Sequence, residues 1–241
     1  VALGTVADMV PLVGENRILA NYGLQVLNQR PDPGIDALAR SAGIQQEMTG
    51  YHIGFVLGPR LNAAGRMASP DLALELLLSG SPRHAMRVAQ QLEESNRERQ
   101  AIEETIRNEA MSRLEADYKP DEPGVLVVSS RSWHKGVVGI VASRLVRRFH
   151  RPAIVISIDE HGVGRGSCRS IPGYDLIENL ETVRDLLAQY GGHRMAAGLD
   201  IEEKNIDEFR RRLNARAGEG MGMEERRPHQ QIDGWIRQED L

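Results

Sequence analysis

The sequence predicts an α/β protein in which a helical first part is followed by one long helix and then by an α/β domain with a mixed sheet. Three observations support this prediction. Apolar residues recur at helical spacing in the first 80 residues, no glycine or proline occurs between Pro82 and Asp117, and strand-like and helix-like patterns alternate from residue 125 onward. At 241 residues the chain has room for one large core or two modest ones.

The composition limits the class of protein. Cys168 is the only cysteine, which excludes an internal disulfide framework or thiolate zinc site and favours a reducing cytosol. No apolar run approaches the roughly 18 residues of a membrane span, and no signal peptide is visible. We therefore expect a cytoplasmic protein. Because the chain starts inside an apolar run, residues 1–6, we also expect a fragment whose first domain is completed by upstream residues.

The first 80 residues are expected to be mainly helical. Turn sequences and cap signals set the boundaries, among them PDPG at 31–34 and the pair Ser69-Pro70, which starts a helix. The expected elements are a strand over 1–6, a helix over 18–27, a helix from about 49 to 61, and a helix starting after residue 70.

A single long helix is expected over residues 81–117. Ser81 and Pro82 repeat the start signal, and an apolar stripe follows at helical spacing. A helix of about 36 residues is about 54 Å long at roughly 1.5 Å per residue. Its middle, residues 93–100, is almost wholly polar, so we expect it to bridge two lobes through solvent. A coiled coil is the alternative, but the stripe is interrupted for too long.

The remaining residues predict an α/β domain. The expected strands and helices alternate as follows: strand 125–129, helix 136–150, strands 153–158 and 162–168, helix 174–190, strand 196–201 and helix 206–217. A linker over 218–227 and a strand over 231–236 of a further unit come next. The expected divisions are therefore 1–80, 81–119, 120–218 and 219–241.

The most informative stretch is 162–173, GVGRGSCRSIPG, which we expect to form a phosphate-binding turn ahead of the helix over 174–190. Glycines let a ligand approach the backbone, arginines offer forked donors, and Pro172 suits the first turn of a helix, whose N-terminus attracts anions. The donors and glycines are Gly162, Gly164, Arg165, Gly166, Ser167, Arg169 and Ser170. The alternative is a glycine-rich hairpin with solvated arginines.

The charge distribution agrees with a local polyanion site. The net charge is −4, so the chain as a whole is not basic. Residues 131–173, however, contain eight lysines and arginines against two acids. Arginines on a solvated helix would give the same count.

Two further segments of this domain carry candidate binding residues. Gly191 and Gly192 place His193 on a tight, exposed turn, where it is able to donate to a phosphate or a leaving group; a structural histidine is the alternative. The segment Trp133-His134-Lys135 lies between a strand and a helix, where open α/β sheets bind ligands. Trp133 either stacks on a base or covers the edge of the core.

Two segments of the helical part are also candidates. Asp8 is a lone carboxylate at the end of the predicted strand, and one carboxylate does not hold a metal ion tightly. Arg60, Asn62 and Arg66 lie around glycines in the run 57–67, which suggests phosphate or sugar contacts. Helix capping explains this second group nearly as well.

Together these motifs resemble the RecJ single-stranded-DNA exonucleases of the DHH phosphoesterase superfamily. The motifs occur in the family's order over nearly the whole chain, and each of them alone is weak. They are GTVADMVPL (4–12), LGPRLNAAGRM (57–67), the long helix, WHKGVVG (133–139), GRGSCRS (164–170) and GGH (191–193).

The resemblance implies a 5′→3′ exonuclease of DNA repair and recombination that cleaves by two-metal hydrolysis. It implies a catalytic lobe with manganese or magnesium, of which Asp8 is one ligand and the others, including the Asp-His-His signature, lie upstream. It also implies a DHH-associated lobe that holds the strand and its 5′ phosphate through Ser167, Arg169 and His193, with Arg66 facing the strand. The stretch after Arg227 resembles the start of an oligonucleotide-binding barrel.

The resemblance further implies single-stranded DNA as partner, a monomer, and a single-strand-binding protein or a helicase as candidate partners. Asp8 and His193 are the implied catalytic residues. The implied nucleic-acid contacts are Arg60, Asn62, Arg66, Trp133, His134, Lys135, Arg165, Ser167, Arg169, Ser170, Gly192 and His193. Two alternatives stay open: a phosphodiesterase acting on short RNA or cyclic dinucleotides, and a non-catalytic nucleic-acid-binding module.

Overall fold

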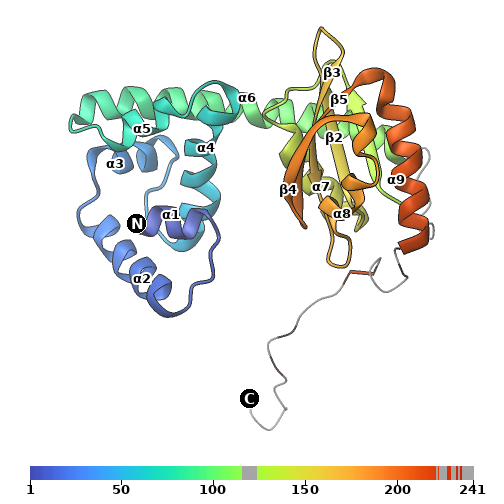
Figure 1. The fold of residues 1–241 in the computed structure, drawn as a ribbon. Helices are drawn as coiled ribbons and strands as arrows, with labels where there is room; N and C mark the ends of the chain where they lie inside the picture. Colours follow the sequence, from blue (N-terminus) through green and yellow to red (C-terminus); the bar gives the residue numbers. More distant parts are fainter. Residues whose placement is uncertain (116–123, 221, 223–226, 229–231, 233, 235–241) are drawn as a thin grey trace. The chain divides into compact units, whose positions relative to one another are not determined.

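The computed structural model describes residues 1–115 and 124–220, together with residues 222, 227, 228, 232 and 234. The chain divides into two compact units, Val1–Ile102 and Glu103–Leu241, which we call the N-terminal unit and the C-terminal unit (Figure 1). The strand expected over 231–236 lies largely outside the described residues. Within the described part, no helix is both long and apolar enough to span a lipid bilayer.

The N-terminal unit is built from helices around a small aliphatic core. Leu38, Leu57, Leu76 and Leu92 are fully buried in that core. The elements are α1 (Ala2–Ala7), α2 (Gly14–Gln29), α3 (Pro33–Ser41), the π-helix η1 (His52–Leu57), α4 (Gly58–Met67), α5 (Asp71–Leu77) and the first part of α6 (Pro82–Glu115).

The strand predicted over residues 1–6 is wrong, because these residues form α1. Ala2 packs so closely on α2 that a Cβ on Gly23 would lie 2.3 Å from the Ala2 Cβ. A strand here would leave its backbone N–H and C=O groups unpaired, since all strands in the described residues belong to one sheet of the C-terminal unit. Packing of a small residue against a glycine therefore outweighs the strand-like pattern of the run.

The long helix is present as α6, but its polar middle is only partly solvated. Glu94 and Glu98 are exposed, as expected. Asn96 and Arg99 are buried, with 2% and 8% of their surface exposed, and the Asn96 Oδ1 accepts a hydrogen bond from the Arg99 guanidinium at 3.0 Å. The expectation that the polar middle of the helix is solvated is thus wrong for these two residues, because polar side chains that hydrogen-bond to each other tolerate burial.

The C-terminal unit contains a five-stranded mixed sheet, which confirms the predicted fold class. The strand order is β1-β2-β3-β5-β4, with β1 and β2 parallel and the other neighbours antiparallel. The elements are β1 (Leu126–Ser130), α7 (Val138–Phe149), β2 (Ala153–Ile158), β3 (Val163–Arg169), α8 (Leu176–Glu181), η2 (Arg184–Leu186), β4 (Leu187–His193), β5 (Ala196–Glu202), η3 (Glu203–Asn205) and α9 (Ile206–Gly220).

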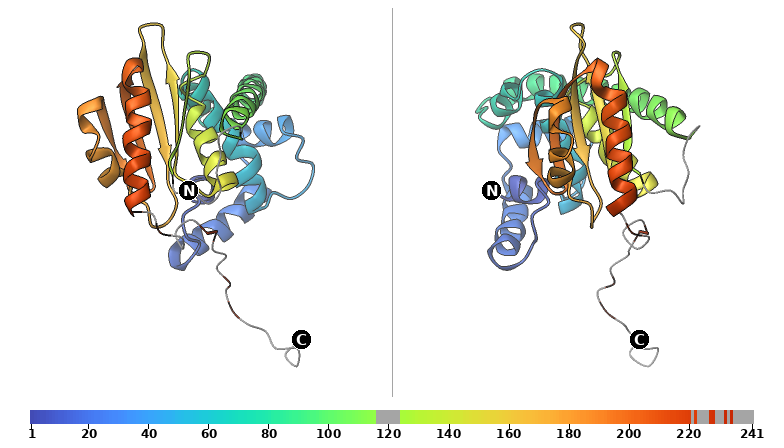
Figure 2. Two further views of the ribbon diagram at one scale, coloured as in Figure 1. Left: turned by 90° about the vertical axis from the view of Figure 1, so that its right-hand side faces the viewer. Right: turned by 45° about the vertical axis from the view of Figure 1, so that its right-hand side comes forward.

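Helices cover the two faces of this sheet unequally. On one face, α8 and α9 bury Leu176, Phe209 and Leu213 against Ile156 and Leu199 of the strands. On the other face α7 packs on β2 and β3. The left view of Figure 2 shows the sheet between α9 and α7. On the α7 side, the described helices of the C-terminal unit show no comparable packing on β5 and β4.

Most of the glycine-rich stretch is the central strand β3, which confirms the strand predicted over 162–168, so the expectation of a turn directly ahead of a helix is wrong. Gly164 and Gly166 face the core: a Cβ on Gly164 would lie 2.7 Å from Ile156 Cγ2, and one on Gly166 would lie 2.7 Å from Leu199 Cδ1. These two glycines make room for the packing of large aliphatic side chains on the α9 side. They do not open the backbone to a ligand.

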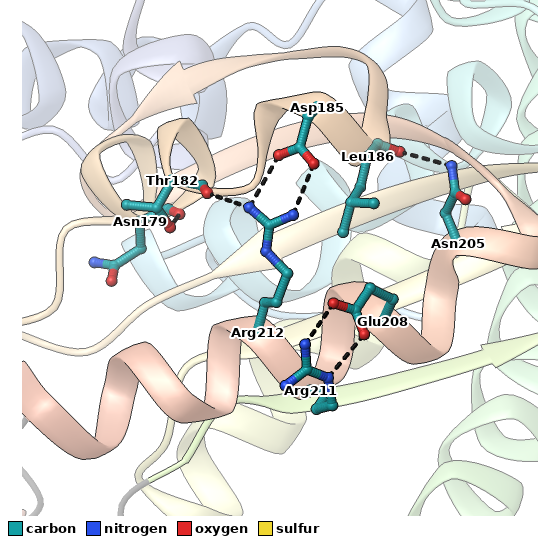
Figure 3. A network of polar contacts seen from close by, with 8 residues as sticks. All are labelled: Asn179, Thr182, Asp185, Leu186, Asn205, Glu208, Arg211 and Arg212. Carbon is teal, nitrogen blue, oxygen red and sulfur yellow. Dashed lines mark hydrogen bonds and ion pairs between the residues drawn. The ribbon is translucent and has the colours of Figure 1, made fainter.

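The helix predicted over 174–190 is also wrong, because only its first turns form. Asp175 caps α8 by accepting from the Ile177 and Glu178 N–H groups at 2.9 and 3.2 Å. Beyond the helix, Arg212 of α9 binds both oxygens of Asp185 and the Thr182 carbonyl at 2.7–2.9 Å (Figure 3). These hydrogen bonds hold the turn after α8 in place, and the chain continues from this turn as the edge strand β4.

Two neighbouring glycines of β4 should respond oppositely to alanine. A Cβ on Gly192, whose φ is +144°, would lie 2.4 Å from the Ala196 carbonyl oxygen, whereas nothing lies within 4 Å of one on Gly191. We expect Gly192→Ala to lower the free energy of unfolding by about 2 kcal/mol or more, and Gly191→Ala to change it by less than about 0.5 kcal/mol. Urea denaturation followed by circular dichroism measures both, and equal losses would contradict this packing.

The middle of α6 should be sensitive only where it is buried. The double change Glu94→Gln and Glu98→Gln should alter the free energy of unfolding by a few tenths of a kcal/mol, as at other surface sites. Asn96→Ala removes the acceptor of Arg99 and should cost about 1–3 kcal/mol. A loss of several kcal/mol for the double change, measured by urea denaturation, would show that the exposed glutamates are packed.

Candidate nucleic-acid interface

The odd-numbered residues of β3 place three predicted ligands on the α7 side of the sheet. Successive side chains of a strand point to opposite faces. Cys168 lies in the core on the α9 side, so Arg165, Ser167 and Arg169 point the other way. A Cβ on Gly139 of α7 would lie 2.9 Å from the Ser167 Oγ and 3.5 Å from an Arg169 guanidinium nitrogen, which confirms this orientation.

The strand register extends this face across β5 to β4. Directly paired residues share a face, so three rows cross from β3 over β5 to the edge strand. The rows are Arg169–Ala196–His193, Ser167–Gly198–Gly191 and Arg165–Asp200–Gln189. We call the surface formed by these three rows the open face. The register thus brings His193 to the row of Arg169, with only the small Ala196 between them.

Arg169 and Ser167 are held at the start of α7. Arg169 Nη1 donates to the Ser167 Oγ at 3.1 Å and to the Cys168 carbonyl at 2.8 Å. Gly139, the second residue of α7, lets the first turn of the helix approach both side chains. The first turn of a helix carries a partial positive charge. In α7 the N–H groups of Val138 and Ile140 already donate to the His134 and Val137 carbonyls, so this partial charge is the main contribution of the helix start. A guanidinium, a hydroxyl and a helix N-terminus therefore meet at one point, which is the chemistry of an anion site.

Further side chains on this side are unpaired. Among the described residues, Arg165, Lys135 and His193 form no hydrogen bond or ion pair through their side chains. On α9, in contrast, Arg211 pairs with Glu208, and Arg212 with Asp185 (Figure 3). Paired arginines attract a polyanion less than free ones do. The open face is therefore the side of the sheet with available cations.

Two predicted ligands have structural positions instead. The Ser170 hydroxyl is buried and donates to the Tyr174 carbonyl at 2.6 Å, which closes the turn after β3. Gly192 allows the backbones of β4 and β5 to approach each other, as its close contact with Ala196 shows. Neither residue presents a polar side chain to the open face.

Trp133 covers the core edge, which favours the structural alternative. Only 4% of its surface is exposed, its Nε1 donates to Glu109 at 2.7 Å, and the Arg113 guanidinium lies 5.2 Å from its ring centroid. His134 Nδ1 accepts from the Gly136 N–H at 3.2 Å, which orders the turn before α7. Within this segment only the exposed Lys135 extends freely into solvent.

The candidates of the N-terminal unit are dispersed. Arg60 is largely buried and pairs with Glu93 at 2.6 Å, so it joins α4 to α6. Asn62 and Arg66 are exposed one helical turn apart on α4. Asp8 is exposed at the C-terminal end of α1. Within the described residues, no group of three or more His, Cys, Asp or Glu side chains could hold a metal ion.

Sequence reasoning missed several residues of the open face, and it placed His193 on a turn although it ends β4. Gln189, Gly198 and Asp200 lie in the rows described above and line a hollow of about 330 Å³. Their positions depend on the register between β4 and β5, which no local sequence pattern predicts. Cys168 is fully buried, and burial raises the pKa of its thiol to about 12.

The C-terminal unit and the whole chain have recognisable relatives. The DHHA1 domain family matches residues 122–219. The single-stranded-DNA-specific exonuclease RecJ of Bacillus subtilis is 40% identical over 242 residues, which cover 100% of this chain and 30% of that protein. RecJ of Escherichia coli is 41% identical over 221 residues, 88% of this chain and 38% of that protein.

Solved structures agree with the sequence relatives. The crystal structure of RecJ in complex with Mg²⁺ from Thermus thermophilus matches with a TM-score of 0.80 and 33% identity, over 90% of this chain and 33% of that one. A structure of the same protein in complex with Mn²⁺ matches with a TM-score of 0.79 and 33% identity, over 90% of this chain and 32% of that one. The chain thus spans roughly a third of the length of these relatives.

Exchanging Trp133 should affect stability and not strand binding. Trp133→Phe removes the hydrogen bond to Glu109 and part of the packing, so the free energy of unfolding should fall by about 1–3 kcal/mol. Affinity for a single-stranded oligonucleotide, measured by fluorescence anisotropy, should change less than about twofold because the ring is buried. A tenfold loss of affinity at unchanged stability would mean that the indole contacts a base.

Proposed function

Since this chain belongs to the RecJ family of single-stranded-DNA-specific exonucleases and carries its DHHA1 domain, we propose that it is the strand- and phosphate-binding part of such an enzyme. The enzyme digests single-stranded DNA from the 5′ end in DNA repair and recombination, in the cytoplasm. It works as a monomer, and a single-strand-binding protein or a helicase is its candidate partner.

The observation that carries this proposal is the anion site at the start of α7. In the proposal, the terminal 5′ phosphate binds between Ser167 and Arg169, with the guanidinium as a charge-assisted donor. His193 lies in the same row on the far side of Ala196 and donates to another oxygen of the same phosphate or to the leaving group. Within the N-terminal unit, Arg66 and Asn62 are separate candidates for contacts with the nucleic acid.

The metal chemistry belongs to the longer enzyme. RecJ structures were determined with Mg²⁺ or Mn²⁺, and two such ions would activate water and stabilise an in-line displacement. Among the described residues, Asp8 is the carboxylate that the family motif marks as a metal ligand. These residues contain no cluster that could hold a metal ion by itself. In the proposal Asp8 is one ligand of the pair, and the other ligands come from parts of the exonuclease that this chain does not contain.

Arg169 should decide the affinity for a 5′-phosphorylated strand. Arg169→Ala should weaken binding of a 5′-phosphorylated single-stranded DNA by roughly 1–3 kcal/mol. It should also reduce the slope of log affinity against log salt by about 0.7, the value for one phosphate on a single strand. Arg169→Lys should restore only part of the loss, because an ammonium lacks the bidentate fork. Fluorescence anisotropy at several salt concentrations measures each value.

Two comparisons give this test its controls. A 5′-hydroxyl strand should lose less than the phosphorylated one if the terminal phosphate is the ligand, and Ser170→Ala should leave affinity unchanged because its hydroxyl is buried. Short RNA and cyclic dinucleotides, tested as competitors, separate the alternative substrates. Unchanged affinity of Arg169→Ala for every strand, with the fold intact by circular dichroism, would refute the phosphate site.

The chain by itself should not hydrolyse DNA. Two-metal catalysis needs several ligands, and the described residues contain no cluster that could hold a metal ion. Nuclease-free protein incubated with Mn²⁺ and a labelled single strand should release no product above background. Metal-dependent cleavage that disappears in Asp8→Ala would show that the metal site lies within this chain.

A further inference from the structure

The open face continues past the proposed phosphate site as a groove along β3. The hollow of about 330 Å³ is lined by Arg165, Gln189, Gly191, Gly198 and Asp200, among others. It lies in the rows next to Arg169 and towards the turn between β2 and β3. None of these residues has a role in holding the terminal phosphate, so the groove needs an explanation of its own.

The floor of the groove is backbone without side chains, at two glycines that neither packing nor backbone conformation requires. Nothing lies within 4 Å of a Cβ on Gly191, and one on Gly198 would meet only the Gly166 carbonyl at 3.8 Å. Neither glycine has a positive φ that would require it. Glycine inside a strand costs stability, and it often marks a place where a ligand approaches the backbone closely. Two such glycines side by side on β5 and β4 therefore indicate a ligand that lies flat on the sheet.

A free cation stands at the far end of this floor. Arg165 is exposed, and its side chain makes no ion pair or hydrogen bond in the part of the chain that the structure describes. Asp200 pairs with Arg165 in the strand register, and the Arg165 charge is one of several causes that lower the pKa of Asp159. Neither carboxylate lies within ion-pairing distance of Arg165. Arg165 thus remains available for an anion, with one competing carboxylate, Asp200, beside it in the groove.

The spacing of the two arginines suits a nucleic-acid backbone. Arg165 and Arg169 share a face four residues apart, which is about 13 Å at roughly 3.3 Å per residue. About four nucleotides span this distance at the duplex rise of roughly 3.4 Å per strand, and fewer do so when the strand is stretched. Because Arg169 is held at the Ser167 hydroxyl and the Cys168 carbonyl, a phosphate bound there leaves Arg165 for a later phosphate of a longer strand.

We propose that the single strand leaves the terminal-phosphate site along β3, over the Gly198–Gly191 floor, and that Arg165 binds an internal phosphodiester. This inference rests on the proposed function, because it takes the 5′ phosphate at Ser167 and Arg169 as the starting point of the path. Asp200 opposes the strand by like charge and sets how tightly the groove holds it.

Strand length tests this path on the full chain. We would measure a 5′-phosphorylated thymidine dodecamer by fluorescence anisotropy and the 5′-phosphorylated dinucleotide by calorimetry. Arg165→Ala should weaken the dodecamer about tenfold and leave the dinucleotide within about twofold, because only the dodecamer reaches Arg165. Asp200→Asn should tighten the dodecamer severalfold at low salt and leave the dinucleotide unchanged. Arg169→Ala should weaken both.

A matched control and the other outcomes keep the two proposals separate. Arg147→Ala removes an exposed arginine from the last turn of α7 and should leave dodecamer affinity within about twofold. A dodecamer unaffected by Arg165→Ala but weakened by Arg169→Ala would overturn the path and leave the phosphate site standing. Equal losses for dodecamer and dinucleotide, or a loss for Arg147→Ala as large as for Arg165→Ala, would also overturn it. Unchanged binding of both ligands by Arg169→Ala would reject the proposed function itself.

Discussion

The pairing register of β3 is the constraint on which the interface depends. Its side chains alternate, so a slip of one residue would turn Arg165, Ser167 and Arg169 into the core. The even positions prevent this slip, because Gly164 and Gly166 leave space that Ile156 and Leu199 fill from the neighbouring strands. Apolar packing on one face of the sheet thereby fixes which polar groups appear on the other.

The same register extends the effect to strands that are distant in sequence. β5 lies between β3 and β4 and contributes only the small residues Ala196 and Gly198 to the rows of Arg169 and Ser167. No large side chain of β5 therefore covers these two rows of the open face. The face is accessible because α7 packs on β2 and β3, while α8 and α9 occupy the opposite side. The charges follow the same division: Arg211 and Arg212 of α9 are paired with acids, whereas Arg165 on the open face has no ion-pair partner among the described residues.

The sequence predicted the class of fold better than it predicted the local structure of the candidate site residues. The long glycine-free run correctly indicated α6, and alternating patterns indicated most strands of the sheet. The stretch 162–173 contains a strand whose glycines serve packing, and its odd-numbered arginine and serine residues lie on one face of the sheet. Residues 182–193 left the predicted helix because Arg212, far away in sequence, holds the turn at Asp185. Contacts of that kind leave no trace in a local pattern.

The RecJ relationship was visible in the sequence and is confirmed, whereas the binding roles of Ser167, Arg169 and His193 remain predictions. Their proximity on one face was not derivable without the register. A crystal structure of this chain with a 5′-phosphorylated oligothymidylate tests the central claim most directly. The account predicts the terminal phosphate within hydrogen-bond distance of the Ser167 hydroxyl and the Arg169 guanidinium, beside the first turn of α7. A strand bound on the α9 side of the sheet, with the open face empty, would contradict it.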